Sequence, residues 1–280
     1  MAILIGIIFI VICIVIWFHI PYSPVKSCFS KDVENLKACN RLKEEGNAFR
    51  SEDFSHLPLA IRRYIEYCGY IGTPKMSYLK MKYHDVDFMQ GRTGPALKID
   101  YTQYDFVSAP CRMALIDSSM FGTPFEGYDY YRDGIGGMKG VIAKGITLFH
   151  QTGAEMDKAC LVTYLAEVMF APSALLQDYI AFEEISDYEV KATIQYGGQI
   201  ASGIFTFNEK YEYVLFTTND RGVTNADGTM EYIPWSAVCG DYHVSGSGIK
   251  YPTKFQAVWN YPDGDFLYFD GRISEISYKE

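Results

Sequence analysis

Residues 152–176, TGAEMDKACLVTYLAEVMFAPSALL, form a strongly apolar stretch in the middle of the chain. Its apolar side chains recur every three or four residues, the spacing of one face of a helix. They are Met156, Cys160, Leu161, Tyr164, Leu165, Val168 and Met169. Only Thr163 and Glu167 form a narrow polar stripe among them. A helix that lies on one sheet needs one apolar face, so this wider surface predicts a helix buried on two sides.

Both ends of this helix are marked in the sequence. Thr152 and Glu155 fit the Thr-x-x-Glu capping box, which begins a helix near Gly153. Pro172 removes a backbone donor and ends it. We therefore expect a helix over residues 153–170.

The sequence on either side of the helix alternates between apolar and polar residues, as strands with one buried face do. The strand-like segments begin with MSYLKMKYHDVDFM at 76–89 and end with DFLYFDGRISEISY at 265–278. Short turns join neighbouring segments, which predicts antiparallel pairing. The glycine-rich GIGGMKG at 134–140 lies between strand-like segments and lacks phosphate-loop spacing, so we interpret it as a flexible hairpin or bulge.

These patterns predict an α+β protein. We expect one large curved antiparallel sheet, a half-barrel or open barrel of about nine to eleven strands, because a sheet of that width must curl or close. The helix at 153–170 would pack on its concave face. Residues 56–280 are assigned to this single β domain with its central helix.

The first residues predict a membrane anchor. MAILIGIIFIVICIVIWFHIPY, residues 1–22, is apolar and uncharged over about eighteen residues, enough to span the hydrocarbon core. Trp17, Phe18 and Tyr22 lie at one end, where interfacial aromatic residues collect. A cleaved signal peptide is the alternative, but no basic region precedes the stretch and no A-x-A-like site follows it. We therefore expect a single-pass protein of the cell membrane that contacts lipid through residues 2–20.

Residues 23–55 are predicted to form a helical stalk and linker, with a polar helix over 30–46. Lys26, Lys31 and Lys37 follow the membrane span and no basic residue precedes it, which by the positive-inside rule favours a cytoplasmic main domain. Single N-terminal anchors commonly carry exported domains. On that ground we expect the main domain outside the cytoplasm, against the lysine pattern.

Composition excludes one class of partner. The net charge is −9 and the pI is about 5.1, whereas nucleic-acid binding requires clustered Lys and Arg. The seven cysteines contain no C-x-x-C pair, so zinc ribbons and thioredoxin-type motifs are absent. Scattered cysteines are usually small buried hydrophobic residues. The one disulfide worth testing is Cys28 with Cys39.

Motifs for catalysis are weak. H-E-x-x-H and G-x-S-x-G do not occur. Asp241 and His243 lie two residues apart, on one face of an expected strand, where an aspartate could orient a base. Asp85 and Arg63 complete the polar candidates. The available histidines have no second histidine at ligand spacing, so we expect no metal and no cofactor, and an enzyme is the less favoured hypothesis.

Three segments resemble an uncharacterised bacterial family known as a domain of unknown function: 57–69, 164–176 and 234–278. The landmarks are Arg63-Tyr64, Tyr164-Leu165-x-Glu167, Pro172-x-Ala174-Leu175-Leu176, Pro234-Trp235, Asp241-Tyr242, Pro252-Thr253, Trp259 and Gly271-Arg272-Ile273. This resemblance covers about residues 55–280 and implies kinship without an activity. The expected architecture also resembles periplasmic lipoprotein-carrier half-barrels, a similarity that does not determine function.

Three hypotheses follow. The first is a membrane-anchored module that binds a lipid or another hydrophobic ligand between sheet and helix, with candidate lining residues Tyr164, Leu165, Val168, Met169, Trp235, Tyr242 and Trp259. The second is an envelope protein-interaction module with a filled core, whose protein partner the sequence does not identify. The third is a hydrolase-like enzyme that uses Asp241 and His243.

Overall fold

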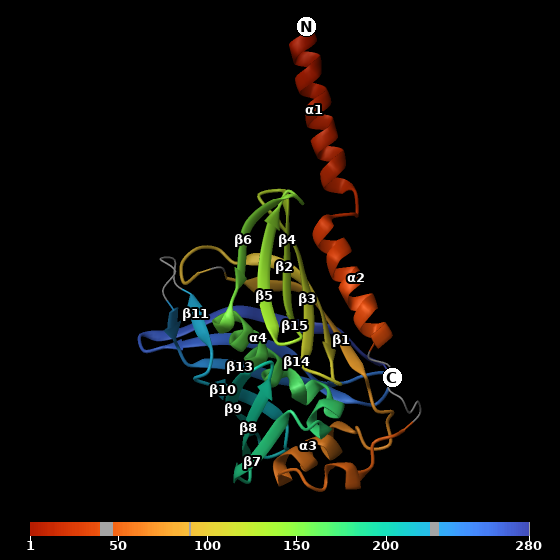
Figure 1. The fold of residues 1–280 in the computed structure, drawn as a ribbon, viewed down its shortest axis with the longest axis vertical. Helices are drawn as coiled ribbons and strands as arrows, with labels where there is room; N and C mark the ends of the chain where they lie inside the picture. Colours follow the sequence, from red (N-terminus) through yellow and green to blue (C-terminus); the bar gives the residue numbers. More distant parts are fainter. Residues whose placement is uncertain (40–46, 90, 225–229, 280) are drawn as a thin grey trace.

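The computed structural model describes residues 1–39, 47–89, 91–224 and 230–279 (Figure 1). Its helical elements are α1 (Ala2–His19), α2 (Pro24–Cys39), η1 (Ser51–Phe54), α3 (Leu59–Cys68), α4 (Ala154–Glu167), η2 (Val168–Phe170) and η3 (Pro172–Leu176). Its strands are β1 (Tyr78–Phe88), β2 (Leu97–Phe106), β3 (Cys111–Met120), β4 (Thr123–Arg132), β5 (Ile135–Ile142), β6 (Ile146–Thr152), β7 (Ile180–Ser186), β8 (Glu189–Tyr196), β9 (Gln199–Phe207), β10 (Tyr213–Thr218), β11 (Gly222–Thr224), β12 (Met230–Tyr232), β13 (Trp235–Val244), β14 (Lys250–Tyr261) and β15 (Gly264–Lys279).

One large curved sheet dominates the fold. Within the described residues it has 13 strands, in the order β6-β5-β4-β3-β2-β1-β15-β14-β13-β10-β9-β8-β7. Neighbouring strands are antiparallel; the first and last strands, β1 and β15, pair at the middle, and the sheet stays open between the edge strands β6 and β7. The predicted α+β fold with a large curved antiparallel sheet is confirmed. The sheet is wider than expected because residues 135–152 add two strands.

The interpretation of residues 134–140 as a flexible hairpin or bulge is correct for the two ends of the segment. Gly134 lies in the β4–β5 hairpin turn, and the β5–β6 register shifts between Gly140 and Val141. Most of the segment, however, belongs to strand β5, which pairs with β4 and β6. Its glycines serve packing. A Cβ on Gly136 would lie 2.8 Å from Cys160 Sγ and 2.8 Å from the Met156 carbonyl oxygen, both on α4. Glycine therefore lets the helix approach the strand closely.

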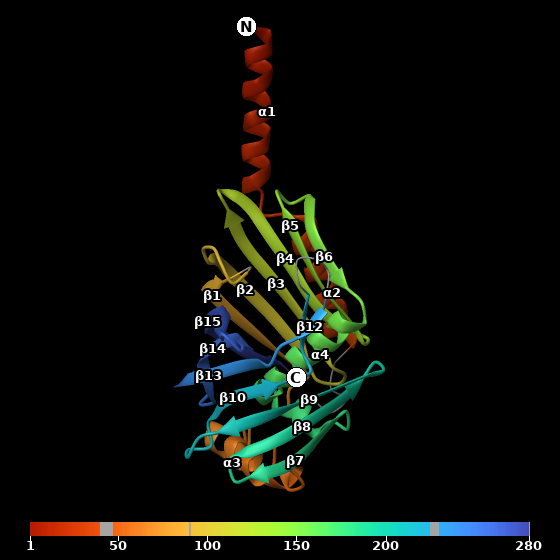
Figure 2. The ribbon, with the colours of Figure 1, turned by 90° about the vertical axis from the view of Figure 1, so that its left-hand side faces the viewer.

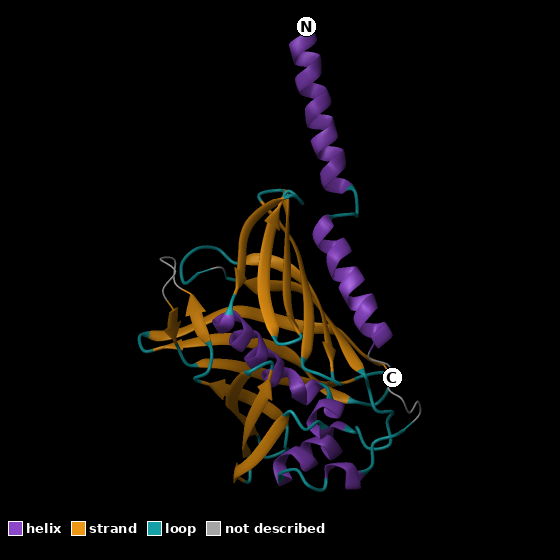
Figure 3. Ribbon diagram, viewed as in Figure 1, coloured by secondary structure: helices purple, strands orange, loops and turns teal. Residues whose placement is uncertain are grey.

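Helix α4 connects the two edges of the sheet. It follows β6, runs along the inside of the curve and leads into β7 (Figure 3). It contacts β4 and β5 from one half of the sheet and β8 and β9 from the other. Together α4 and η2 extend over 154–170, in agreement with the predicted helix.

The predicted capping box at the start of α4 is wrong. The N-cap residue is Gly153, and no side chain caps this end. Thr152 is instead the last residue of β6, while the Glu155 carboxylate accepts a hydrogen bond from the Tyr232 hydroxyl. Thr152 therefore pairs with β5 as part of the sheet and does not cap the helix.

The two halves of the sheet touch each other beside the first turns of α4. The β4–β5 turn meets the β8–β9 turn where a Cβ on Gly197 would lie 2.4 Å from the Cα of Gly134. Nearby, the ring centroids of Tyr131 and Tyr196 lie 6.4 Å apart, with the ring planes inclined at 65°. The open sheet is thereby drawn around the helix.

The space between sheet and helix is filled with apolar side chains. Leu161, Val162 and Tyr164 point to different sides of α4 and are 0%, 0% and 2% exposed, so the helix is buried on two sides, as predicted. Helix α3 covers the end of this core, where the Tyr64 hydroxyl donates to the Met169 carbonyl at 3.0 Å.

The N-terminal helix α1 projects beyond the sheet (Figure 2). Its 18 residues are apolar enough for a membrane anchor or a signal sequence. At 1.5 Å per residue it is about 27 Å long, close to the hydrocarbon thickness of a bilayer.

Helix α2 begins at Pro24, earlier than the predicted helix over 30–46, and residues 40–46 lie outside the described part of the chain. It packs on the outside of the sheet, against β3 and β4, rather than standing free. Its buried residues follow helical spacing: Val25, Phe29, Val33 and Leu36. Cys28 and Cys39 are both free thiols, so the disulfide considered between them does not occur.

The contact between the two halves of the sheet can be tested at adjacent glycines. Gly197 and Gly198 both have positive φ, +58° and +80°, but only a Cβ on Gly197 meets another part of the chain. We expect Gly197→Ala to lower the free energy of unfolding by about 1–3 kcal/mol more than Gly198→Ala, because overpacking adds to a similar backbone strain. Urea unfolding of the full chain in detergent measures this difference, and equal losses would contradict the contact.

Candidate functional site

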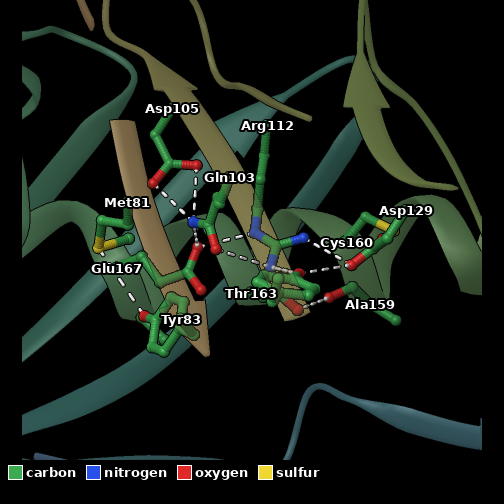
Figure 4. Close-up of polar contacts among 12 residues, drawn as sticks. Met81, Tyr83, Gln103, Asp105, Arg112, Asp129, Ala159, Cys160, Thr163 and Glu167 are labelled. Carbon is green, nitrogen blue, oxygen red and sulfur yellow. Dashed lines mark hydrogen bonds and ion pairs between the residues drawn. The ribbon is translucent and has the colours of Figure 1, made fainter. Parts of the chain in front are cut away.

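The polar stripe of α4 faces a buried cluster of charged side chains (Figure 4). Glu167 is 4% exposed and lies against Arg112 of β3, which is 5% exposed. Arg112 Nε donates to Glu167 Oε2 at 2.8 Å, and its Nη1 donates to Asp129 Oδ2 at 2.6 Å. Buried ions need such partners because desolvation costs several kcal/mol per charge.

Strand β2 supplies the other half of the cluster. Tyr101, Gln103 and Asp105 alternate along the strand, so their side chains share its inner face. Gln103 Nε2 donates to the Asp105 carboxylate at 2.7 and 2.9 Å and to Glu167 Oε2 at 2.7 Å. Arg112 Nη2 donates to the Tyr101 hydroxyl at 2.6 Å and to Gln103 Oε1 at 3.2 Å. The amide of Gln103 thus bridges two carboxyl groups.

The cluster distributes charge unequally. Burial raises the pKa of Asp105 well above its ordinary value of 3.8, and the neighbouring Glu167 raises it further. Burial also raises the pKa of Glu167, but Arg112 opposes that shift through charge and a hydrogen bond. The pKa of Arg112 is raised despite its burial because Glu167, Tyr101 and Asp129 favour its charged form. Asp105, which is bonded to the neutral amide of Gln103, is therefore the carboxyl group whose charged form is less favoured.

A cavity of about 110 Å³ adjoins this cluster. Its aromatic walls come from Tyr83, Phe88, Trp235, Phe255, Tyr268 and Phe269. Its polar wall comes from Gln103, Arg112, Asp129, Thr163, Glu167 and Arg221. The cavity has room for roughly four water molecules. It is amphipathic, with charged groups on one side and aromatic rings on the other.

Arg221 bridges the helix to this aromatic wall. Its Nη1 donates to the Ala159 carbonyl at 3.2 Å and to the Thr163 hydroxyl. Its guanidinium carbon lies 4.7 Å from the ring centroid of Trp235 and 5.7 Å from that of Trp259, within range of a cation–π interaction. Its Nε is buried and has no hydrogen-bond partner among the described residues. Arg221 therefore brings an unused donor to the wall of the cavity.

The predicted lining residues fall into two groups. Trp235 lines the cavity, and Trp259 lies behind it, stacked on Tyr268 at 6.1 Å. The others belong to the packed core away from the cavity: Tyr164, Leu165, Val168, Met169 and Tyr242. The apolar face of α4 thus fills the fold, and its polar stripe meets the cavity.

The predicted polar residues do not come together. Asp241 forms an ion pair with Arg272 at 2.7 Å, and His243 is exposed on the same strand. Asp85 lies near Lys98 at 3.6 Å, three strands away from Asp241 in the sheet. The fourth candidate, Arg63, pairs with Glu66 on the surface of α3. These four residues do not line the cavity.

The residues of the charged cluster were missed by sequence reasoning, although the sequence indicates some of them. Glu167 is the single acid in the second half of an otherwise apolar helix. Gln103 and Asp105 occupy alternating positions of a strand whose buried face should be apolar. Arg112 and Asp129 gave no local signal, because only strand pairing brings them together. Among the described residues, no group of three His, Cys, Asp or Glu side chains is placed to hold a metal ion.

A helix enclosed by an open antiparallel half-barrel, with an amphipathic cavity between them, defines the class of this protein. The chain belongs to the family of unknown function DUF6544, which matches residues 47–271. The expected kinship with an uncharacterised family is thus confirmed. No curated protein matches this sequence.

Two solved structures are similar to the chain. One is described as an outer membrane lipoprotein-sorting protein domain from Vibrio parahaemolyticus, with 9% identity, a TM-score of 0.43, and coverage of 82% of this chain and 93% of that one. The other is a DUF1329 family protein from Desulfovibrio piger, with 12% identity, a TM-score of 0.33, and coverage of 79% and 90% respectively.

The buried ion pair should matter far more for stability than an exposed one. We expect Arg112→Met to lower the free energy of unfolding by about 3–5 kcal/mol at neutral pH, because it leaves buried carboxylates without a counter-charge. The matched control is Arg272→Met, whose exposed partner Asp241 predicts a loss below about 1 kcal/mol. The deficit of Arg112→Met should shrink as pH falls and Glu167 gains a proton. Losses of equal size in urea unfolding would contradict a desolvated cluster.

The raised pKa of Asp105 predicts that its contribution to the stability of the fold decreases with rising pH, the opposite of the usual behaviour of a carboxylate in a folded protein. A carboxyl group with a raised folded-state pKa binds its proton more tightly in the folded protein, so its contribution to stability declines as pH rises above 3.8. Asp105→Asn should remove this decline. The control is Asp53→Asn, because the Arg50 backbone amide lowers the pKa of Asp53 and its contribution is instead lost as pH falls. Unfolding measured from about pH 2 to pH 8 separates the two, and a stability gain of Asp105→Asn confined to low pH would contradict the assignment.

Proposed function

We propose that this chain is a membrane-anchored module that binds a lipid or another amphiphilic molecule in the cavity between sheet and helix. The polar end of the ligand would meet Arg112, Glu167 and Arg221, and its apolar part would lie against Trp235 and Tyr268. The observation that carries this proposal is the pairing of a buried charged wall with an aromatic wall in one cavity. Ligand pockets commonly combine an apolar lining with a few placed polar groups.

The size of the cavity constrains the ligand. At about 110 Å³ it is smaller than the roughly 300–1,000 Å³ of pockets that enclose a drug-sized molecule. It therefore takes one end of a ligand and leaves the remainder outside. Arg221 lines the cavity, and its guanidinium, whose Nε has no hydrogen-bond partner among the described residues, supplies a donor for an oxygen of the ligand.

The same proposal includes the placement of the chain. Residues 1–22 anchor it, residues 23–55 lead to the sheet, and residues 56–280 form the binding domain outside the cytoplasm. Retention of α1 is supported by Lys144 on the β5–β6 turn, whose ammonium donates to the Trp17 carbonyl at 2.9 Å and to the Ile20 carbonyl at 2.5 Å. Cleavage of a signal peptide would remove these acceptors from a lysine that is 4% exposed.

A second candidate function is a protein-interaction module of the cell envelope without a ligand. It is favoured by the filling of the interior, where Leu161, Leu165 and Met169 have no exposed surface. The enzyme hypothesis gains no support from the geometry, because Asp241 is paired with Arg272 and His243 is exposed outside the cavity.

The ligand can be tested by filling the cavity. Ala257 lines it and is 4% exposed, so Ala257→Leu should occupy the space that a ligand end requires. The control is the same substitution at Ala181, which is exposed on β7. Native mass spectrometry and lipid extraction of the purified full chain should detect a bound molecule in the wild type and in Ala181→Leu, but not in Ala257→Leu. A wild-type chain that carries no molecule after gentle purification would favour the interaction module.

A further inference from the structure

The β5–β6 turn is bonded to the last turn of the membrane helix. Lys144 Nζ donates to two carbonyl groups at the C-terminal end of α1, those of Trp17 and Ile20. In return, Trp17 Nε1 donates to the Ala143 carbonyl at 3.2 Å. Orphan carbonyl groups at a helix end are favourable sites for a cation. These bonds hold the turn at the level where α1 would leave the membrane.

Exposed apolar side chains gather at this end of the sheet. We call Phe121, Ile146 and Leu148 the apolar tip. Phe121 is fully exposed at the β3–β4 turn, while Ile146 and Leu148 are 61% and 50% exposed on the edge strand β6. The two turns are neighbours, because the Ala143 amide donates to the Pro124 carbonyl at 2.8 Å. Figures 1 and 2 show both turns at the base of α1.

The apolar tip continues the surface of α1. A wedge of about 460 Å³ between them is lined by helix residues from Phe9 to Phe18 together with Ala143 and Ile146. Phe9 lies about two turns before Trp17 along the helix, so the wedge runs along the last turns of α1. Since α1 is only about as long as the hydrocarbon core is thick, side chains beside its last turns lie at membrane depth.

The backbone conformation and the exposure of Phe121 also favour contact with hydrocarbon. Phe121 and Gly122 both have positive φ, +52° and +77°, as in a type I′ turn, where asparagine or aspartate normally precedes glycine. A bulky residue is disfavoured in this region, and a fully exposed phenyl ring in water is a further cost. Burial of the ring in hydrocarbon would offset both costs.

We propose that the apolar tip inserts into the lipid bilayer beside α1, as a second membrane contact of this chain. This inference rests on the anchor in the proposed function and does not depend on a ligand in the cavity. Two attachments, the helix and the tip, fix the orientation of the half-barrel on the membrane surface. The partner of the apolar tip is lipid, because the tip is continuous with the surface of α1, the helix proposed to span the bilayer.

Quenching by brominated lipid tests the insertion. The full-length variants Phe121→Trp and Ile146→Trp are reconstituted in phosphatidylcholine vesicles whose acyl chains are brominated near the headgroup. The matched control is Ile185→Trp, at an apolar position that is 49% exposed on β7, far from α1. Because Trp235 and Trp259 also fluoresce, the signal of Trp17, which reports the anchor, is the difference between the wild type and Trp17→Phe. The signal of each introduced tryptophan is its difference from the wild type.

We expect the tryptophans at 121 and 146 to be quenched to an extent comparable with Trp17, and the one at 185 to be unaffected. If Trp17 is quenched and those at 121 and 146 are not, the anchor stands and the insertion is overturned; shielding of the tip by a second copy of the chain gives this result. If Trp17 itself is unaffected, the anchor fails as well. Equal quenching at all positions would indicate nonspecific adsorption and also overturn the proposal.

Discussion

The fold depends on the enclosure of one apolar helix. Helix α4 joins the two edge strands, β6 and β7, so the chain cannot place it elsewhere than across the open side of the sheet. Its apolar surface covers most of its circumference, and leaving that surface in water would cost about 25 cal/mol per Å². The sheet therefore curls until both halves contact the helix. The meeting of Gly134 and Gly197 marks the point where this curling brings the halves into contact with each other.

A charged cluster in such a core requires an explanation. Replacing a buried ion pair by apolar residues of similar volume is often neutral or stabilising, so Arg112 and Glu167 are not needed for stability alone. Together with Gln103 they form a network in which each carboxyl group has a donor, while Arg221 contributes a buried donor that has none. The cluster and the aromatic rings thus present charged and apolar groups to the same cavity.

The sheet is covered by a helix on each of its two faces. Inside, α4 shields the core. Outside, α2 continues from the end of α1 and lies along β3 and β4, where Lys26 pairs with Asp117 at 2.6 Å. The helix that follows α1 is thus part of the domain rather than a free tether.

Local patterns in the sequence were sufficient for the elements and the fold class. Period-two alternation predicted the strands, helical spacing and Pro172 predicted the central helix, and a continuous apolar run predicted α1. These features depend only on residues close together in the sequence. Their side chains share one face of a helix or strand whichever element packs against that face. The strand character of 135–142 was not recognised because its glycines make room for residues on other elements, Cys160 of α4 beside Gly136 and Phe149 of β6 beside Gly140.

The site, in contrast, was decided by tertiary structure. Arg112, Asp129 and Glu167 come from two strands and a helix, and only the pairing of β3 with β4 and the crossing of α4 bring them within hydrogen-bond distance. A sequence pattern reports which residues share a face of one element. It carries no information on which faces of distant elements meet, because that choice is made by packing the whole chain around α4.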